Sequence, residues 1–375
     1  MSELFIYGDP RFLSGGKNDR SKINYESPLP TIEKNDPIIT TEDFLVAGET
    51  DLVSAMTNKT SQAIHTGKHS YHYGQTSYSN IFVHEDDKEP TVGVELEMEE
   101  RTNVSRDSVA KHLHSNWFHF ERDSSLCIQG REGYELVTEA LPSFRARDIN
   151  LWVGLQNILV PWFESYSHAV TGLHVHVGLQ NLMKCTNTPF HDEREVKSLA
   201  RALVTLIYYS LYPRGFVDRV MLRSATNYCA SELPTQYAQS ITQLSGSLPA
   251  YKWINAAVRS IFLSNGHESS CEFYTVDDVA LPRSQLPQSR RDYCTTGHHT
   301  ELNFGSKYTV EFRRGKGTLH APSILRMVEL AVLTVKYAEF IMNNPEAIIG
   351  RTEFKQFVIE NTKSEAFRTL AEKYM

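Results

Sequence analysis

The chain has no excess of basic residues, no long apolar run and no sign of an export signal. Its 38 Lys and Arg are outnumbered by 45 Asp and Glu, so the net charge is -7. Binding of nucleic acid without sequence recognition depends on positive charge, and we therefore expect none. No apolar stretch reaches the roughly 20 residues of a membrane helix, and the N-terminus MSELFIYGDP lacks the basic and apolar regions of a signal peptide. These features predict a soluble, cytoplasmic protein that does not bind membranes.

The chain also has few cysteines and lacks several catalytic motifs. The five cysteines are scattered without a C-x-x-C pair, which is typical of reduced thiols. Cys229 has no basic partner that would make it a nucleophile. The sequence contains no H-E-x-x-H, no G-x-S-x-G and no G-x-x-x-x-G-K-[ST], which excludes zincins, serine hydrolases of that type and P-loop enzymes. A cupin would need a Glu shortly after His-x-His, but Gln180 stands there.

Residues 1–88 are rich in Ser, Thr, Asn, Asp, Gly and Pro, with few apolar residues at regular spacing. This composition predicts an extended arm of low order, with at most a short helix at 41–58. The arm is a candidate binding element for a homo-oligomer or a larger assembly.

The remainder interleaves strand-like and helix-like segments. We predict strands at 91–100, 118–128, 134–141, 172–177, 301–304 and 308–313, the second and third forming a hairpin. We predict helices at 105–117, from 146 to 162 with a kink at Pro161, at 193–209, within 239–262, at 322–343 and at 352–373. Because part of the strands come as hairpins, the pattern favours an α+β fold with a curved, mostly antiparallel sheet backed by helices. The predicted domains are 1–88, a core of 89–345 and a C-terminal helix in 346–375.

Three of these strands carry polar residues at every second position. Residues 91–100, TVGVELEMEE, place Glu95 and Glu97 on one face, because residues two apart in a strand share a face. His174 and His176 alternate in the same way, as do Glu311 and Arg313. Glu99 shares the face of Glu95 and Glu97 by the same alternation, and Glu99 and Glu100 are expected to be outer or solvent-facing carboxylates. Alternative interpretations are a solvated strand face, a core histidine and a structural Glu311–Arg313 ion pair.

If these strands line one cavity, the polar residues would form a metal and phosphate site. Ligation mostly by carboxylates suits Mg²⁺ or Mn²⁺ better than zinc, and the number of carboxylates is enough for two ions. Arg313 would then point into the same cavity, where a guanidinium could stabilise a phosphate transferred from ATP. The candidate metal ligands are Glu95, Glu97, Glu135, His174 and Glu311.

Several short segments, taken in order, resemble the amidoligase family of carboxylate-amine ligases, which is related to glutamine synthetase and glutamate-cysteine ligase. The resemblance covers about residues 91–345. The segments are Gly93-Val-Glu-Leu-Glu97, Asp123-Ser-Ser-Leu126, Glu135-Leu-Val-Thr138, Gly172-Leu-His-Val-His176, Arg223-Ser-Ala-Thr-Asn-Tyr-Cys229, Glu311-Phe-Arg313 and Gly317-Thr318. One departure is Glu139-Ala140, where family members often have Pro.

The resemblance implies a glutamine-synthetase-like half-barrel and a role for each matching residue. Glu95, Glu97 and Glu135 would bind divalent metal, and His174 with Glu311 would complete a second metal position. Arg313 would contact the transferred phosphate and His176 would lie near the nucleotide or substrate. The resemblance assigns Asp123 and Arg223 to substrate or phosphate contacts, and either Arg290 or Arg291 to the family's arginine before the 301–304 strand.

The activity implied by the resemblance is ATP- and metal-dependent formation of an amide between a carboxylate and an amine, with amino acids or peptides as substrates. ATP would phosphorylate the carboxylate, and the amine would attack the acyl phosphate. Two other interpretations are open: a non-catalytic assembly or scaffold protein that keeps the ligase fold, and a kinase of a carboxylate or guanidino group.

Overall fold

The computed structural model describes residues 89–101, 118–122, 126, 133–138, 140–165, 171–185, 193–223, 235–263, 301–304 and 308–375. The predicted arm at 1–88 and the predicted helix at 105–117 lie outside these ranges. So do Asp123, which was assigned to substrate or phosphate contacts, and Arg290 and Arg291, the two candidates for the family's arginine before the 301–304 strand, of which Arg291 was expected to bind the nucleotide.

The main sheet is antiparallel throughout its described pairings, in the order β2-β3-β1-β6-β9-β8. Two short strands, β4 and β5, pair with the two ends of β1. These described strands do not close into a barrel. The bounds are β1 Thr91–Glu100, β2 Phe118–Arg122, β3 Gly133–Thr138, β4 Leu141–Pro142, β5 Phe163–Glu164, β6 Gly172–Gly178, β8 Leu302–Asn303 and β9 Thr309–Lys316. A second sheet pairs β7 Leu248–Pro249 with β10 Ile348–Ile349.

Strand β1 shows why the sheet has one apolar and one acidic face. Its apolar residues Val94, Leu96 and Met98 are completely buried in the core, whereas Glu95 and Glu97 alternate with them. Burial of the apolar face stabilises the strand by removing its side chains from water, and it directs the glutamates to the opposite face.

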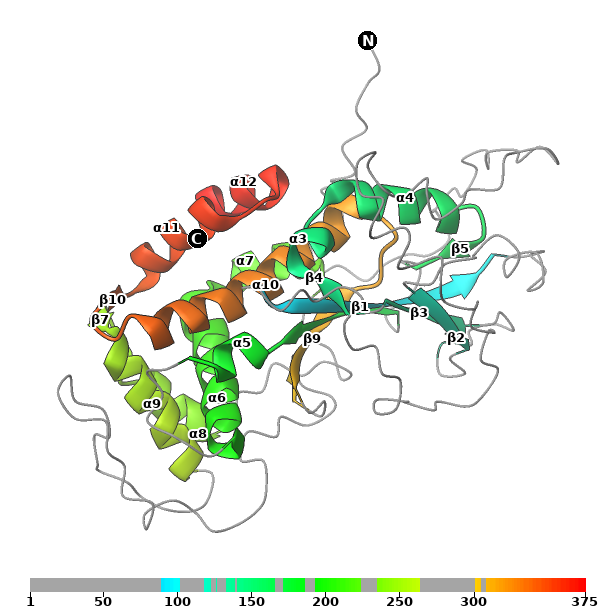
Figure 1. Cartoon of the computed structure of the whole chain (residues 1–375). Helices are drawn as coiled ribbons and strands as arrows, with labels where there is room; N and C mark the ends of the chain where they lie inside the picture. Colours follow the sequence, from blue (N-terminus) through cyan, green and yellow to red (C-terminus); the bar gives the residue numbers. More distant parts are fainter. Residues whose placement is uncertain are drawn as a thin grey trace. The chain divides into compact units, whose positions relative to one another are not determined.

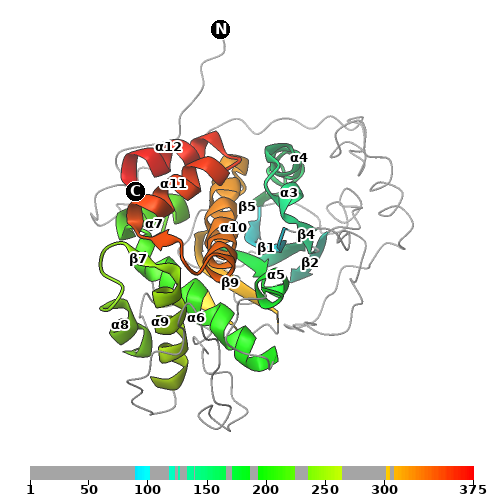
Figure 2. The same cartoon turned by 60° about the vertical axis from the view of Figure 1, so that its left-hand side comes forward.

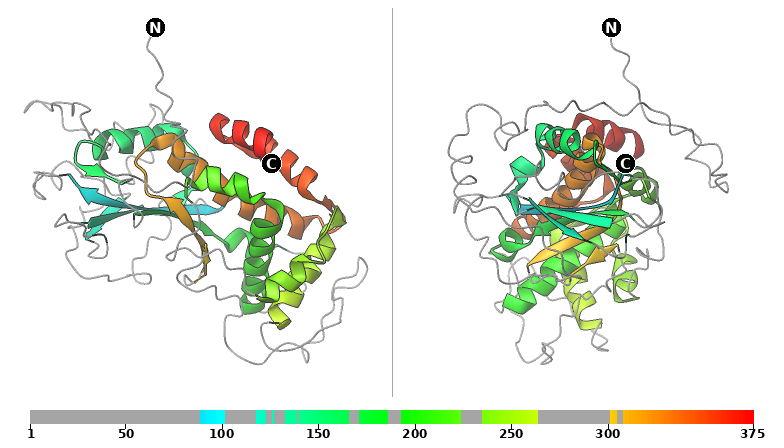
Figure 3. Two further views of the ribbon diagram at one scale, coloured as in Figure 1. Left: turned by 180° about the vertical axis from the view of Figure 1, so that it is seen from behind. Right: turned by 90° about the vertical axis from the view of Figure 1, so that its right-hand side faces the viewer.

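Helices cover the apolar face of the sheet. Helix α10 is apolar nearly all round, contacts β6 and α4, and lies with α4 on the same side of the sheet (Figures 1 and 3). Helices α6, α8 and α9 form a separate group that contacts α10 through α6 and α9 (Figure 2). The helices are α3 Ser143–Ala146, α4 Ile149–Leu159, α5 Gln180–Met183, α6 Glu193–Leu211, α7 Arg214–Met221, α8 Thr235–Ile241, α9 Ala250–Leu263, α10 Ala321–Asn343, α11 Arg351–Asn361 and α12 Glu365–Tyr374.

The α+β prediction with a mostly antiparallel sheet backed by helices is confirmed, but two predicted helices differ in detail. The helix predicted to kink at Pro161 ends at Leu159, because a proline has no N–H to donate to the preceding turn. The single helix predicted at 352–373 is two helices. Ser364 accepts a hydrogen bond from the backbone N–H of Phe367 and starts α12, which separates it from α11.

The two C-terminal helices pack onto the core through aromatic rings. Phe354 of α11 contacts Tyr212 at a ring-centroid distance of 4.7 Å, and Phe367 of α12 contacts Phe216 at 5.5 Å. Figure 2 shows both helices beside α10. No helix in the part of the chain that the structure describes has the length and apolar character needed to cross a bilayer.

Candidate metal centre

Strand pairing brings the predicted ligands onto one patch of the sheet. Glu95 of β1 lies opposite His174 of β6, and Glu97 lies opposite Glu135 of β3. One strand further, Glu311 of β9 lies opposite His176. Residues that face each other across an antiparallel pair project from the same face. Four neighbouring strands therefore direct carboxylates and imidazoles to one place.

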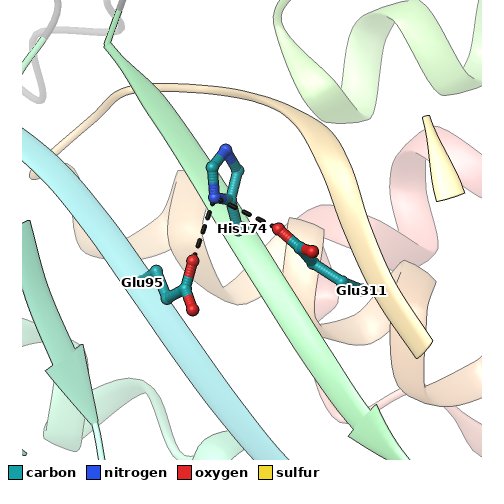
Figure 4. A group of neighbouring side chains, drawn as sticks. All are labelled: Glu95, His174 and Glu311. Atoms are coloured by element: carbon teal, nitrogen blue, oxygen red, sulfur yellow. Dashed lines mark hydrogen bonds and ion pairs between the residues drawn. The ribbon is translucent and has the colours of Figure 1, made fainter. Parts of the chain in front are cut away.

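The first ligand group consists of Glu95, His174 and Glu311. His174 Nδ1 lies 3.1 Å from Glu95 Oε2 and 3.4 Å from Glu311 Oε1. Figure 4 shows the three side chains pointing toward one another from adjacent strands. All three are buried, and one ligand atom from each lies within 4.8 Å of the others, so a single cation could contact all of them.

The second ligand group consists of Glu97, Glu135 and His174, which also offer atoms within 4.8 Å of one another. His174 Nε2 lies 3.7 Å from Glu97 Oε1. The imidazole of His174 thus stands between two pairs of carboxylates, with Nδ1 toward one pair and Nε2 toward Glu97 of the other. The arrangement provides two adjacent groups of possible ligands, and a neutral His174 could bind a cation in only one of them, because only one of its ring nitrogens has a free lone pair.

His176 supplies positive charge at the edge of the first group. Its Nε2 lies 2.9 Å from Glu95 Oε1 and 3.9 Å from Glu311 Oε1. Burial disfavours the imidazolium, but these two carboxylates raise the pKa of His176 to about 9. For Glu95, burial alone would raise the pKa, because it disfavours the carboxylate. The neighbouring His176 and the contact with His174 outweigh burial and hold the pKa of Glu95 well below its usual range. Glu95 is therefore a carboxylate at neutral pH.

Glu311 is held by two further side chains. Arg313 Nη1 donates to Glu311 Oε1, and Asn303 Nδ2 donates to Oε2 at 2.6 Å. The backbone N–H of Arg313 donates to the carbonyl oxygen of Glu301 at 2.9 Å. These contacts orient the Glu311 carboxylate and place a guanidinium directly beside the first ligand group.

The backbone next to the site comes close to the ligands at Gly172. Its N–H donates to Glu97 Oε2. A Cβ at this position would lie 2.9 Å from His174 Nε2, which is closer than real contacts allow, and 3.2 Å from Glu97 Oε2, which is tight. A side chain at position 172 would therefore require His174 or Glu97 to move from its present place.

The structure brings two of the remaining predicted residues to the first ligand group. His176 and Arg313 lie at the first ligand group, whereas Arg223 follows helix α7 and belongs to neither group. Asp123 and Arg291 lie outside the described residues, so their roles stay predictions.

The expectation that Glu99 is an outer or solvent-facing carboxylate is wrong, because Glu99 is completely buried, whereas Glu100 is half-buried. At this end of β1, strand β5 pairs with one edge and β3 with the other, so Glu99 faces Glu164 and Gly133. Alternation placed Glu99 on the face of Glu95 and Glu97 but did not predict that it is buried there.

The sequence patterns did not predict the contact of Asn303 with Glu311 or the closeness of Gly172 to the ligands. Asn303 lies directly opposite Glu311 in the β8–β9 pairing. No local pattern signals this contact, because it depends on the register between two strands. Gly172 is the first residue of β6, and its closeness to His174 and Glu97 depends on the pairing of β6 with β1.

The donor set fits hard divalent cations. Each ligand group has two carboxylates and one imidazole nitrogen, and no cysteine is present among its members. Oxygen-rich sets of this kind suit Mg²⁺ or Mn²⁺. No model of a known protein family matches the chain, and no curated protein matches it either. The amidoligase resemblance therefore rests on the motifs quoted above.

Proposed function

We propose that this chain is an ATP- and divalent-metal-dependent ligase that joins a carboxylate to an amine, built on a glutamine-synthetase-like half-barrel. The observation that supports the proposal most is the meeting of two three-residue ligand groups at His174, with Arg313 beside one of them. Two adjacent cation positions next to a guanidinium suit a reaction that moves a phosphoryl group.

In this proposal Glu95, Glu311 and His174 Nδ1 would hold one cation, and the carboxylates of Glu97 and Glu135 would hold the other, because a neutral imidazole binds a metal through only one of its nitrogens. Bound divalent ions would polarise the phosphate oxygens of ATP and offset their charge. The ordering of Glu311 by Asn303 and Arg313 reduces the reorganisation that cation binding requires.

Arg313 and the burial of the site support the chemical steps. The substrate carboxylate attacks the terminal phosphorus of ATP, giving an acyl phosphate and ADP. The guanidinium of Arg313 stabilises the charge that spreads over the phosphoryl oxygens during this transfer. An amine then attacks the acyl carbon and phosphate leaves, and burial of the surrounding carboxylates limits competing attack by water.

The direct experiment incubates the full chain with ATP, Mg²⁺ and pairs of amino acids or short peptides, and follows release of ADP. A ligase gives ADP release that depends on both the acid and the amine, together with a product whose mass equals the two substrates minus water. Release that needs the acid but no amine would instead indicate the carboxylate kinase. Absence of both nucleotide binding and turnover would favour the scaffold interpretation.

A first prediction concerns Glu97→Gln, which removes one carboxylate from the second ligand group while keeping its size. Loss of a charged ligand oxygen should weaken Mn²⁺ binding about 10- to 100-fold and abolish metal-dependent ATP binding. Isothermal titration calorimetry measures both affinities, and circular dichroism checks the fold. The matched control is Glu372→Gln on the exposed part of α12, which makes the same charge change. Equal affinities in the two variants would contradict the assignment.

A further inference from the structure

Strand β9 contains a bulge where it passes the ligand groups. Its register against β6 shifts by one residue, so Arg313 and Arg314 together lie opposite His174. The side chain of Arg313 donates to Glu311 in the first ligand group, whereas that of Arg314 is buried and donates to Asp218 of α7. Two consecutive arginines thus have different partners. A slip of the bulge by one residue would change which of them reaches the ligand groups.

One residue, Glu301, contacts both of these arginines. It directly precedes β8, and its backbone carbonyl accepts a hydrogen bond from the N–H of Arg313 at 2.9 Å. Its side chain is completely buried, and Oε1 lies 3.4 Å from Arg314 Nη1. Glu301 therefore holds the backbone at one position of the bulge and the side chain at the next.

Helix α7 fixes the carboxylate of Glu301 in turn. Arg214, the first residue of α7, donates to Oε2 at 2.7 Å and also to Oε1. A fork of two parallel hydrogen bonds sets the plane and direction of a carboxylate as well as its position. Asp218 of the same helix accepts from Arg314 Nη2, so two carboxylates balance the two guanidinium groups. This network ties the bulge of β9 to α7 and to the start of β8.

We propose that Glu301 is a positioning residue, which holds the bulge in register so that Arg313, and not Arg314, reaches the first ligand group. This inference rests on the proposed function, in which Arg313 stabilises the transferred phosphoryl group. Glu301 belongs to neither ligand group, so its effect on the phosphate passes through Arg313.

The first test compares the binding of ATP and ADP, which differ by the phosphate that Arg313 contacts in the proposal. With Mn²⁺ present, Arg313→Gln should reduce the preference for ATP over ADP about tenfold or more, the loss expected for a hydrogen bond between charged groups. Glu301→Gln should reduce it by a similar factor and leave the affinities for ADP and Mn²⁺ nearly unchanged. The double variant should lose no more of the preference than Arg313→Gln alone, because both changes remove the same contact. Isothermal titration calorimetry measures all of these affinities.

The matched control is Glu329→Gln. Glu329 is also completely buried and paired with an arginine, but it lies in α10 and belongs to neither ligand group. This control should leave the preference for ATP unchanged even where it lowers stability. An unchanged preference in Glu301→Gln, an equal weakening of ATP and ADP binding, or additive losses in the double variant would overturn the positioning role.

If Glu301→Gln does not fold, Arg314→Gln takes its place. This variant removes the side-chain contact at the bulge and keeps the pair between Arg214 and Glu301. It should reduce the preference for ATP, and Arg314→Lys, which keeps the charge, should restore part of it. A preference in Arg314→Gln equal to that of the natural chain would count against the proposal in the same way.

A second test needs neither nucleotide nor turnover. In crystal structures, the guanidinium of Arg313 should contact Glu311 in the natural chain and lose this contact in Glu301→Gln, and an unchanged contact would overturn the positioning role. If the natural chain binds neither nucleotide, the ligase proposal is wrong, and the crystal structures still decide whether Glu301 directs Arg313. If the natural chain and Glu301→Gln prefer ATP over ADP equally, the ligase proposal stands and the positioning role is wrong.

Discussion

At position 172, a methyl group would lie between two ligands of the candidate metal centre. Gly172→Ala places a Cβ within 2.9 Å of His174 Nε2, so either the imidazole or the strand must shift. Since both ligand groups use His174, we expect Mn²⁺ affinity to fall by about tenfold or more while the free energy of unfolding changes by only about 1 kcal/mol. Calorimetric titration of Mn²⁺ and urea unfolding measure the two effects.

Gly215 is the matched control, because it lies in α7 and a Cβ there would meet no atom within 4 Å. Alanine is favoured over glycine in a helix, so Gly215→Ala should raise the free energy of unfolding by about 0.5–1 kcal/mol and leave Mn²⁺ binding unchanged. Unchanged Mn²⁺ binding in Gly172→Ala would show that His174 is not a ligand.

Away from the metal centre, Glu339 of α10 is a carboxyl group that titrates near neutral pH. Burial raises its pKa to about 7, and repulsion from Glu89 adds to the effect of burial while Lys336 opposes it. Between pH 4.5 and 7 the folded chain therefore holds a proton that the unfolded chain has released. The free energy of unfolding should fall as pH rises through this window, by an amount on the order of 2 kcal/mol.

Glu339→Gln should remove this fall, so that the variant is more stable than the natural chain at pH 8 and the difference shrinks toward pH 5. Urea unfolding at the two pH values measures it, with the exposed Glu346→Gln as the control. A variant that is less stable than the natural chain at pH 8 would mean that the charged carboxylate is stabilised in the fold.

At the scale of elements, a buried ion pair ties α10 to two other parts of the chain. Glu329 is completely buried and accepts hydrogen bonds from Arg147 Nε at 3.2 Å and Nη2 at 3.0 Å. It also accepts from the backbone N–H of Lys363, between α11 and α12. One carboxylate therefore connects the α3–α4 turn, helix α10 and the C-terminal helix pair.

Glu329→Ala leaves the buried Arg147 without its counter-ion and should lower the free energy of unfolding by about 3–5 kcal/mol. Replacing both residues should cost less than the sum of the single changes, because no unpaired charge remains. Chemical denaturation of the two single variants and the double variant gives the coupling. The exposed pair Arg368–Glu365 is the control and should contribute about 0–1 kcal/mol. Additive effects of the single changes at Glu329 and Arg147 would contradict a stabilising ion pair between these two residues.

At the scale of the whole molecule, the last 30 residues contribute to the core rather than only covering it. Phe354 and Phe367 are completely buried and contact rings of α7, α10 and the segment between α6 and α7. Phe354→Ala should lower the free energy of unfolding by about 3–5 kcal/mol, and a chain ending at residue 345 should lose cooperative unfolding.

Removal of residues 1–88 is the complementary truncation. All members of both ligand groups lie between Glu95 and Glu311. We therefore expect a chain of residues 89–375 to bind Mn²⁺ as the full chain does, which calorimetry can measure. Loss of binding in that chain would contradict the predicted boundary at residue 88. For the C-terminal truncation, normal cooperative unfolding of a chain ending at residue 345 would contradict the expected contribution of the last 30 residues and would support a domain boundary at residue 345.

Much of the sheet could be predicted because strand periodicity is a local property. Glu95 with Glu97, and His174 with His176, share a face whatever the strands pair with, and their apolar neighbours supply the packed face. Periodicity placed Glu99 on the same face but could not predict its burial, because strands β3 and β5, which flank it, are distant in sequence. It also failed for the C-terminal helix, where the cap at Ser364 outweighed a continuous helical pattern.

The sequence by itself determined which residue types share a face of each strand, since the two-residue repeat is set by backbone geometry. Only the tertiary structure decided that Glu311 lies opposite His176 and that His174 stands between two carboxylate pairs, because the order and register of β3, β1, β6 and β9 arise from contacts between distant segments. The same holds for Lys316: a one-residue bulge in β9 pairs it with Gly172, whereas alternation along β9 alone would have placed it on the face of Phe312 in the core.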